Sequence, residues 1–548
     1  MISVFLFAPP VGYLFLLASW HLLRRHLLAK FNGVSDLPLL QQSRPPNERI
    51  RGTAIVCGGS IAGLLTARVC HDHFERVLIV EAEPWVASEE GRKVDGWVNK
   101  THRSRVVQYT SLHSCQCFLF QGLLCLFPNL EEERKLSDVS AIPSYPRFNL
   151  AGVPFRVPWS TYKSGLPKTL YNTRGGFETL IRRLVLDRDA YPNIEFIAGT
   201  VTDVRPDPTD HSRLNLVVVR TEAGIREFPA VLVADCTGPA RAGMKWLERN
   251  GYGYSSKYPT GTLPLDQLKI SFDQKLRYST ITFRIRPEIY KRLPLPRDLE
   301  DTKPIYTLLE NSPDGNRRAF VLMRADGENL IAFAGHHGTT QQQPKNLAEL
   351  KEYARGLHMV RPIPAWIFEL MDVLEEVEDS ATVSLVRIPP TTYVRYHQAI
   401  NLPSNWIAVG DSCMTLDPLF AEGCPKAFRG ALALHKVLRT IRTTSGITLP
   451  YDFSTKFFAE QYDKTDWNWQ NTRVMDYGVP TTEPLPGESL SSGASLRWYI
   501  AKLQRLALID EHAGLVLFDS SMGLATAIDA FHPNLIFKIF WRALLGGI

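Results

Sequence analysis

The stretch AIVCGGSIAG at residues 54–63 decides how the rest of the chain is interpreted. It begins as a short β-branched strand, passes through a glycine turn and continues as a helix over 64–70. A second apolar strand, VLIVE at 77–81, follows and ends in an acid. This order of strand, glycine turn, helix and strand predicts the first βαβ unit of a dinucleotide-binding fold.

The small residues of this turn have different physical tasks. Gly58 makes the tight turn and Gly63 lets the helix pack closely on the strand, while free amides at the helix N-terminus receive a pyrophosphate. Gly59 and Ser60 lie between them, and Ser60 stands where GxGxxG has its second glycine. Glu81 follows Gly58 by 23 residues, the position of a carboxylate that binds an adenosine ribose. We therefore predict that all five residues bind the cofactor.

Composition excludes some functions. The chain has 548 residues, of which 45% are hydrophobic and 22% charged, and a net charge of +6 that is small for this length. No basic cluster contains interleaved aromatic residues, so we expect no nucleic-acid partner. The eight cysteines form no CxxC pair, which predicts no metal site and reduced thiols in a reducing compartment.

The N-terminus predicts a membrane anchor. Residues 2–23 are uncharged and mostly apolar, and Arg24, Arg25, His26 and Lys30 follow them. About 20 apolar residues can cross a bilayer, and a positive flank after the segment places the catalytic domain on the cytosolic side. We expect a membrane-associated protein, of the type found at the endoplasmic reticulum. The alternative is a hydrophobic element packed on the domain.

The C-terminal stretch 534–545 is apolar with two spaced cations. It suits a helix lying at a membrane interface and equally a buried terminal helix.

Patterning along the chain predicts an α/β protein with two interleaved domains. After an anchor at 1–26 and a polar linker at 27–50, a discontinuous dinucleotide-binding domain covers 51–255 and 395–445. Residues 256–394 form a second domain on a mixed or antiparallel sheet, and 446–548 form a helical region whose last helix either lies at a membrane interface or is buried. Helices are expected at 111–129, 175–185 and 428–441, and strands at 194–197, 214–220, 230–235, 280–286, 319–324, 330–334, 383–388 and 406–409.

Two later motifs return to the first domain. One is the strand end Asp235-Cys236-Thr237-Gly238. The other runs from Gly410-Asp411 through Asp417-Pro418 to Gly423, at the start of a periodic helix.

With the glycine turn, these motifs resemble the flavoprotein monooxygenase family, which includes aromatic hydroxylases and squalene epoxidases. The finer resemblance is to hydroxylases similar to polyprenyl-methoxyphenol hydroxylase, and it covers about residues 52–545. The resemblance rests on four stretches: VQYTSLH at 107–113, Phe127-Pro128, Thr173-Arg174 and the segment 235–253.

The resemblance implies a Rossmann-type FAD-binding domain interleaved with a mixed β-sheet substrate domain. Glu81 would hold the adenosine ribose, Asp411 the ribityl chain, and Asp235 would lie near FAD at its strand end. The turn from Pro418 to Gly423 would bring a helix N-terminus to the flavin pyrimidine, where its positive end stabilises the reduced ring. Arg174 would lie near the isoalloxazine or the phosphates, unless it is an exposed residue at a helix start.

In this family the cofactor carries the chemistry: NAD(P)H reduces the flavin, and oxygen supplies the transferred atom. We therefore nominate no catalytic residue. His113 either faces the flavin or substrate or is a core residue of the apolar helix. No second nucleotide motif follows residue 100, so the nicotinamide shares the cleft or an external reductase supplies electrons.

The sequence departs from the family at Ala421, Glu422, Thr110 and Ser111. Ala421 stands where a positive φ would strain any residue except glycine. Glu422 places a carboxylate near a ring that becomes anionic, and Thr110 and Ser111 replace an arginine and a histidine.

The sequence thus predicts an FAD-dependent monooxygenase of secondary metabolism that acts on a lipophilic terpenoid, polyene or polyketide. The alternatives are a reductase or dehydrogenase similar to geranylgeranyl reductases, and a non-catalytic flavoprotein. A halogenase is disfavoured because Trp467-Asn468-Trp469 does not reproduce the motif expected of that class.

Overall fold

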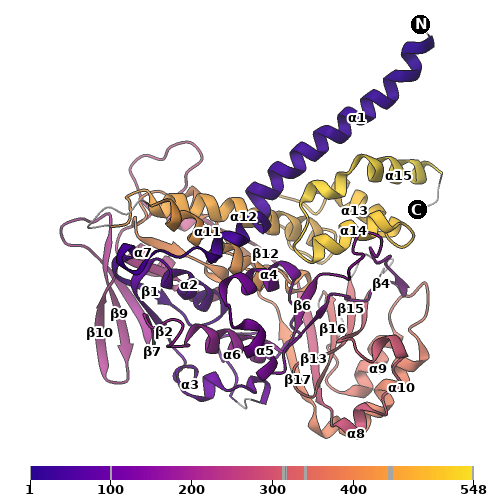
Figure 1. Cartoon of the computed structure of the whole chain (residues 1–548), viewed down its shortest axis with the longest axis horizontal. Coiled ribbons are helices and arrows are strands. Elements are labelled where there is room, and N and C mark those ends of the chain that lie inside the picture. The colour runs from indigo at the N-terminus through magenta and orange to yellow at the C-terminus, as the bar shows by residue number, and fades with distance from the viewer. Residues whose placement is uncertain are drawn as a thin grey trace.

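The structure is a computed structural model that describes residues 2–98, 101–310, 315, 317–338, 342–441 and 448–545, with side chains from residue 12 onward. A parallel sheet with its helices forms one half of the body, and a large mixed sheet forms the other (Figure 1). Helices from the C-terminal region lie across one side of the mixed sheet, and α1 projects from the body.

The predicted βαβ unit is confirmed at the centre of a five-stranded parallel sheet. Its order is β19-β11-β1-β2-β7, so the strand before the glycine turn has neighbours on both sides. Central strands of such sheets are buried on both faces, which is why they read as continuous apolar runs. The strands are β1 (Ile50–Cys57), β2 (Phe74–Glu81), β7 (Ile194–Ala198), β11 (Leu232–Asp235) and β19 (Trp406–Ala408).

Helix α2 (Ile61–His71) is buried on nearly every side because the sheet, α6 (Arg174–Val185) and α11 (Gly423–Thr440) surround it. The helix begins within van der Waals reach of the turn before it. A Cβ built on Gly63 would lie 1.8 Å from the Gly58 carbonyl oxygen. Helices α6 and α11 confirm the elements expected near 175–185 and 428–441.

The predicted mixed sheet is present and has seven strands in the order β17-β13-β16-β15-β14-β4-β5. Only β14 and β4 pair in parallel. Helices α9 (Leu347–Arg355) and α10 (Ala365–Leu374) pack on one face. Two strands come from before residue 256, outside the range predicted for this domain. The strands are β4 (Phe148–Leu150), β5 (Val153–Pro154), β13 (Leu276–Arg284), β14 (Pro304–Leu309), β15 (Arg318–Arg324), β16 (Asn329–His337) and β17 (Thr382–Arg387).

Smaller sheets complete the fold. The strand expected at 214–220 is the centre of the antiparallel sheet β10-β9-β8, and two further pairs are β3 with β6 and β12 with β18. Most of these strands are short or exposed on one side, so their hydrophobic alternation in the sequence is too weak to predict them. They are β3 (Ser140–Pro143), β6 (Lys168–Tyr171), β8 (Thr200–Pro206), β9 (Leu214–Thr221), β10 (Gly224–Pro229), β12 (Lys269–Phe272) and β18 (Thr391–Val394).

The helix predicted over 111–129 starts later than expected, as α4 (Cys117–Leu126). The residues before it stay extended because other elements hold their backbone. The Thr169 hydroxyl donates to the Cys115 carbonyl at 2.7 Å, and the Leu112 amide donates to Thr280 Oγ1 at 3.2 Å. The remaining helices in the first 300 residues include α3 (Pro84–Ala87), α5 (Leu130–Leu136), α7 (Ala242–Arg249) and α8 (Pro287–Tyr290).

The segment 27–50, predicted as a linker, packs against the first domain. It forms a π-helical turn at Leu28–Asn32 and a 3-10 helix at Val34–Gln41. Leu37 and Leu40 are buried in the main core. Apolar side chains at these positions anchor the segment although the surrounding sequence is polar.

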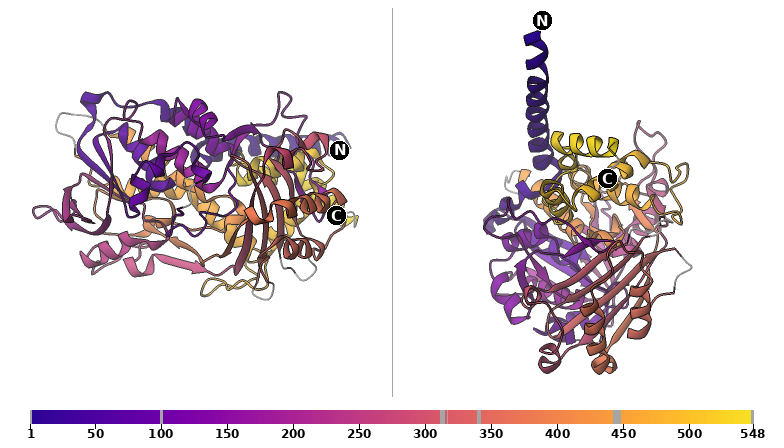
Figure 2. Two further views of the ribbon diagram at one scale, coloured as in Figure 1. Left: turned by 90° about the horizontal axis from the view of Figure 1, so that it is seen from below. Right: turned by 90° about the vertical axis from the view of Figure 1, so that its right-hand side faces the viewer.

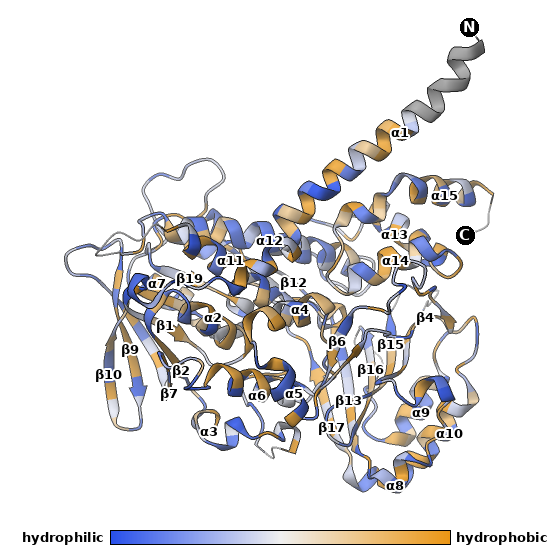
Figure 3. Ribbon diagram, viewed as in Figure 1, coloured by the Kyte–Doolittle hydropathy of each residue, from blue (hydrophilic) through white to orange (hydrophobic). Residues whose placement is uncertain are grey.

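The prediction of a membrane-associated protein is wrong. Within the part of the chain described above, no helix combines the length and the apolar character needed to cross a bilayer. Helix α1 (Ile2–Leu27) projects from the body, and polar residues interrupt its apolar ones toward the C-terminal end (Figures 2 and 3). Helix α15 (Pro533–Leu544) spans about 18 Å at 1.5 Å per residue, well short of a hydrocarbon core of about 30 Å.

The described part of α1 contacts the C-terminal region. The Trp20 indole donates to the Ile528 carbonyl at 2.9 Å, and Arg24 pairs with Asp529. Helix α15 buries Leu535 and Ile539. The hydrophobic residues of both terminal helices are therefore used partly for contacts within the protein. The other C-terminal helices are α12 (Phe453–Asp476), α13 (Ala494–Leu506) and α14 (Glu511–Ser521).

Gly63→Ala should destabilise the protein by about 1–3 kcal/mol or more, because the added methyl group overlaps the Gly58 carbonyl. Chemical denaturation measures the change. Gly356→Ala is the control, since its Cβ would meet its nearest neighbour at 3.4 Å, and it should change stability by less than about 0.5 kcal/mol. Equal stabilities for the two variants would contradict the close approach of helix and turn.

Candidate functional site

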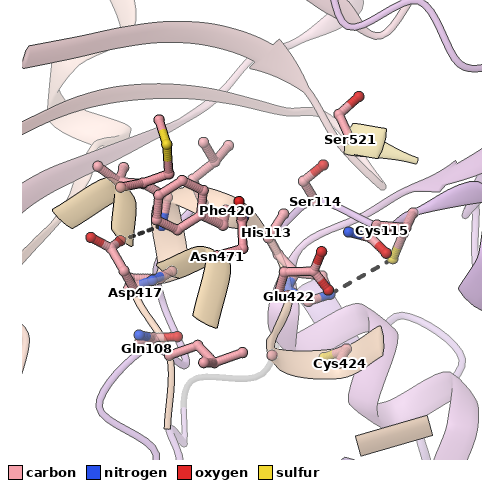
Figure 4. A pocket seen from close by; sticks show the side chains of 18 of the residues that line it. Gln108, His113, Ser114, Cys115, Asp417, Phe420, Glu422, Cys424, Asn471 and Ser521 are labelled. Atoms are coloured by element: carbon pink, nitrogen blue, oxygen red, sulfur yellow. Dashed lines mark hydrogen bonds between the residues drawn. The ribbon is translucent and has the colours of Figure 1, made fainter. Parts of the chain in front are cut away.

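A cavity of about 2280 Å³ lies where the two halves of the molecule meet. It begins at the glycine turn, where Gly58, Ser60 and Glu81 line it, and extends to side chains of the seven-stranded sheet and of the C-terminal helices. Ligand pockets usually measure about 300–1000 Å³, so this cavity is large enough for more than one bound molecule. Figure 4 shows part of its wall.

The glycine turn is shaped by its neighbours. Gly58 has φ of 121°, and a Cβ there would lie 2.3 Å from the Cys236 carbonyl oxygen. The Gly59 amide donates to Glu81 Oε2 at 2.8 Å. Glu81 thus holds the turn in addition to facing the cavity, and its carboxylate retains acceptor sites for a further hydroxyl donor. Gly63 lies behind this turn, in the helix.

A buried arginine, Arg103, connects the turn to α6. Its guanidinium donates to Glu81 at 2.9 Å and also contacts Glu83 and Glu178. Burial alone would lower the pKa of Arg103, but the three carboxylates, Glu178 foremost, outweigh burial and raise it. Nothing near residue 103 in the sequence signals this role, because its partners come from two other elements.

Ser60 joins the same network. Its hydroxyl donates to Glu178 Oε2 at 2.9 Å and accepts from Arg174 Nη2 at 3.1 Å. Arg174 and Arg182 also pair with Glu178, at 2.8 and 2.5 Å. Burial works against the Glu178 carboxylate, yet the surrounding guanidinium groups lower its pKa to about 2. The serine that departs from GxGxxG therefore fills a polar position between α2 and α6.

Arg174 is buried and lines the cavity, so it is not the exposed helix-start residue that the alternative described. Its Nη1 atom is buried without a hydrogen-bond partner. The spacing Arg174, Glu178, Arg182 places all three on one helix face and was visible in the sequence.

Helix α11 brings a second N-terminus to the cavity. Gly410, Asp411, Pro418 and Gly423 all line it. Asp411 is half exposed and pairs with Lys426 at 2.5 Å. Neither α2 nor α11 has a side-chain cap on its first amides, so both helices direct free donors and the positive ends of their dipoles at the same space.

Asp235 is fully buried behind this wall. It accepts from the amides of Thr237 and Gly243, at 2.9 and 3.0 Å, and from Ser412 Oγ at 3.1 Å. Burial raises its pKa. The carboxylate fixes the turn between β11 and α7 and ties it to the Gly410 segment.

The structure shows how Ala421 and Glu422, which differ from the family pattern, are accommodated. Ala421 has φ of 54° and ψ of 29°, which is the left-handed conformation that strains any residue except glycine. Glu422 accepts from Asn468 at 2.7 Å and pairs with Arg429 at 3.3 Å. The carboxylate that faces the cavity is thus offset by a buried guanidinium from the next turns of α11.

The segment 107–113 lines the cavity at Val107, Gln108, Leu112 and His113. His113 is half-buried and packs against Phe177, and burial followed by the Arg174 charge lowers its pKa to about 3, so its imidazole is neutral at pH 7. Cys115 Sγ lies 3.7 Å from its Nε2 atom. The altered positions Thr110 and Ser111 are bonded to the seven-stranded sheet and not to the turn.

The residues present fit FAD. Two uncapped helix N-termini suit a pyrophosphate and an anionic ring, Glu81 and Asp411 face the space as hydroxyl acceptors, and Arg174 has an unpartnered donor for a phosphate. A molecule that spans all of these groups needs the length of a dinucleotide.

Comparison with solved structures confirms the predicted resemblance at the level of the fold. The flavin-dependent brominase Bmp2 superposes with a TM-score of 0.53 at 12% identity, over 90% of this chain and 100% of that one. A flavoprotein/dehydrogenase from Cytophaga hutchinsonii gives a TM-score of 0.52 at 13% identity, over 91% of this chain and 100% of that one. No protein-family model and no curated protein matches the sequence. The chain has the fold of flavin-dependent enzymes.

Replacing Arg103 with methionine should cost about 3–5 kcal/mol, because three buried carboxylates would lose their shared partner. Urea denaturation measures the loss. Arg76→Met removes an exposed pair with Glu195 and should cost about 1 kcal/mol or less. A loss as small at Arg103 as at Arg76 would show that the buried network contributes little.

Ala421→Gly should stabilise the protein by about 1 kcal/mol, since glycine adopts the left-handed backbone conformation without a clash at Cβ. Thermal unfolding measures the effect. The exposed Ala190 has a negative φ, so Ala190→Gly should instead lower stability slightly. Destabilisation by both changes would contradict strain at Ala421.

Proposed function

We propose that the protein is an FAD-dependent monooxygenase, a hydroxylase or an epoxidase, that uses NAD(P)H and oxygen. The observation that carries this proposal is a continuous cavity that joins the glycine turn to the seven-stranded sheet. A cofactor held at the turn and a substrate bound against the sheet would meet inside it. The fold similarity to two flavoproteins supports the cofactor class.

When bound, FAD supplies the redox chemistry, and the protein binds and orients it. Glu81 would accept hydrogen bonds from the adenosine ribose and Asp411 from the ribityl chain. The amides that open α2 would receive the pyrophosphate, with Arg174 beside it. The amides that open α11 would lie against the pyrimidine end, where the helix dipole favours negative charge.

The substrate we propose is lipophilic, such as a terpenoid, a polyene or an aromatic polyketide. The cavity wall as a whole is mostly apolar. Side chains of the mixed sheet and of the C-terminal helices contribute to it, among them Val321, Met323, Phe333, Ile500, Leu517 and Phe531. Such a wall excludes water and orients an apolar molecule by shape.

Electrons would come from NAD(P)H. The described residues contain one parallel βαβ unit with a glycine turn, so the nicotinamide would enter the shared cavity or a reductase partner would deliver the electrons.

The test is the absorption spectrum of the purified protein, followed by anaerobic reduction with NADPH and re-exposure to air with candidate lipophilic substrates. A bound flavin that NADPH bleaches, with oxygen consumed in proportion to an oxygenated product, would support the proposal. Reduction of an alkene without oxygen uptake would point to a reductase instead. Halide-dependent product would point to a halogenase, and flavin that no nicotinamide reduces to a non-catalytic protein.

Gly58→Val should abolish FAD retention, because its side chain has no space between the turn and Cys236. The flavin-to-protein absorbance ratio after gel filtration measures this. Gly52→Val is a matched control: Gly52 has φ of 98° and a Cβ there would lie 2.7 Å from Val231, but it lies near the start of β1, at the end away from the turn. The control should lose stability and keep its flavin. A yellow Gly58→Val protein would contradict the placement of the cofactor.

A further inference from the structure

Three ionisable side chains meet at the cavity wall outside the proposed cofactor contacts. His337 ends β16, Asp417 precedes Pro418, and Asp476 is the last residue of α12. His337 Nε2 lies 3.2 Å from Asp417 Oδ2, and the facing atoms of all three lie within 4.8 Å of one another. His337 and Asp417 line the cavity, and Figure 4 shows Asp417 on its wall.

The hydrogen bonds of the two carboxylates are unequal. Asp417 accepts from the Leu419 amide at 2.8 Å and contacts His337. Asp476 is fully buried, and neither of its oxygens has a donor. Its neighbour is another acceptor, Asp417. Two carboxylates so close cannot both be charged at low cost, whereas one proton between them satisfies both.

The position of Asp476 also disfavours its charged form. It closes a 24-residue helix, where the dipole is negative. Burial, and after it the charge of Asp417, raises the pKa of Asp476, while Arg317 opposes the shift.

The other elements around the pair contribute few charges. Arg317 donates to the Met475 carbonyl at 2.7 Å and lies near Arg497 of α13. Tyr278 of β13 donates its hydroxyl to Ser111, and burial and the charge of Asp417 raise the pKa of that hydroxyl. Arg473, one turn earlier on α12, pairs with Glu488.

We propose that Asp417 and Asp476 share one proton and act, together with His337, as a general acid toward an oxygen atom of the bound substrate. The inference rests on the proposed function, since it concerns the substrate of the same cavity. The substrate class is a lipophilic molecule that carries an epoxide, carbonyl or alkoxide oxygen.

In the step itself, the O–H bond of the pair breaks and a new O–H bond forms on the substrate oxygen. No electrons are gained or lost. The pair is left with a second negative charge, which Arg317 and the Leu419 amide offset. A proton from water returns through His337, whose Nδ1 atom has no other partner.

The same donor atoms could bind a divalent cation, because imidazole and carboxylate groups are common metal ligands. Arg317 already supplies a positive charge beside them, and this charge would repel a divalent ion. Metal analysis of the purified protein separates the two.

The first experiment tests the shared proton without cofactor or substrate. Infrared difference spectra of wild type against Asp476→Asn, at pH 7.5 in H2O and D2O, should show a protonated carboxyl band that the variant lacks. Because the folded pair holds a proton that two unfolded aspartates release, wild-type melting temperature should fall as pH rises from 6.5 to 8.5. The variant should show a smaller slope. Asp519→Asn is the control: burial raises the pKa of Asp519 only to about 6, so this variant should keep the band and the wild-type slope.

The second experiment tests the acid role through the pH profile of product formation. Asp476→Asn and His337→Gln should lower kcat by about 10²-fold and remove its alkaline limb, while flavin content and the rate of flavin reduction stay at the wild-type level. Asp519→Asn should keep the wild-type profile. If Asp476→Asn does not fold, Asp417→Asn carries the same test.

Several results would overturn the inference: no carboxyl band difference, a wild-type pH profile in Asp476→Asn, or one divalent ion per chain that this variant loses. A protein that binds no FAD would refute the proposed function. The infrared and melting data would still decide whether the proton is shared.

Discussion

The contact between Arg103 and three glutamates is the interaction on which the glycine-turn end of the cavity depends. Glu81 and Glu83 lie at and just after the end of β2, and Glu178 lies in α6, so one guanidinium joins the 81–83 segment to α6. A buried charge needs a partner of opposite sign, because the free energy of removing an unpaired ion from water is large. The Gly59 amide bonds to Glu81, and the network thereby fixes the glycine turn.

This fixed turn positions the first of two helix N-termini, and α11 supplies the second from 362 residues further along the chain. Helix α11 reaches the same space because it packs against α2. Two positive helix ends that converge on one cavity favour a long, anionic ligand with polar groups at both ends. The cavity extends beyond this part to the mixed sheet and the C-terminal helices, which contribute apolar side chains to its wall.

The sequence alone determined the parts that depend on local pattern. The βαβ unit, the helix after Pro418 and most long strands follow from hydrophobic period and glycine spacing, which are properties of short segments. Short and half-exposed strands such as β4 and β12 carry too little pattern to be found this way. At the N-terminus the sequence pattern was clear but misleading. The apolar composition of residues 2–23 predicted a membrane-spanning helix, whereas Trp20 and Arg24 contact the C-terminal region.

Only the tertiary structure decided how distant polar residues combine. Arg103, Glu178 and Ser60 lie in three separate segments, and His337, Asp417 and Asp476 in three others. A charged side chain inside a protein is stable only beside its partner, and the partner is set by which elements pack together. Local sequence encodes the elements and leaves that packing open, so the glycine turn could be predicted from the chain while the charges that hold it could not.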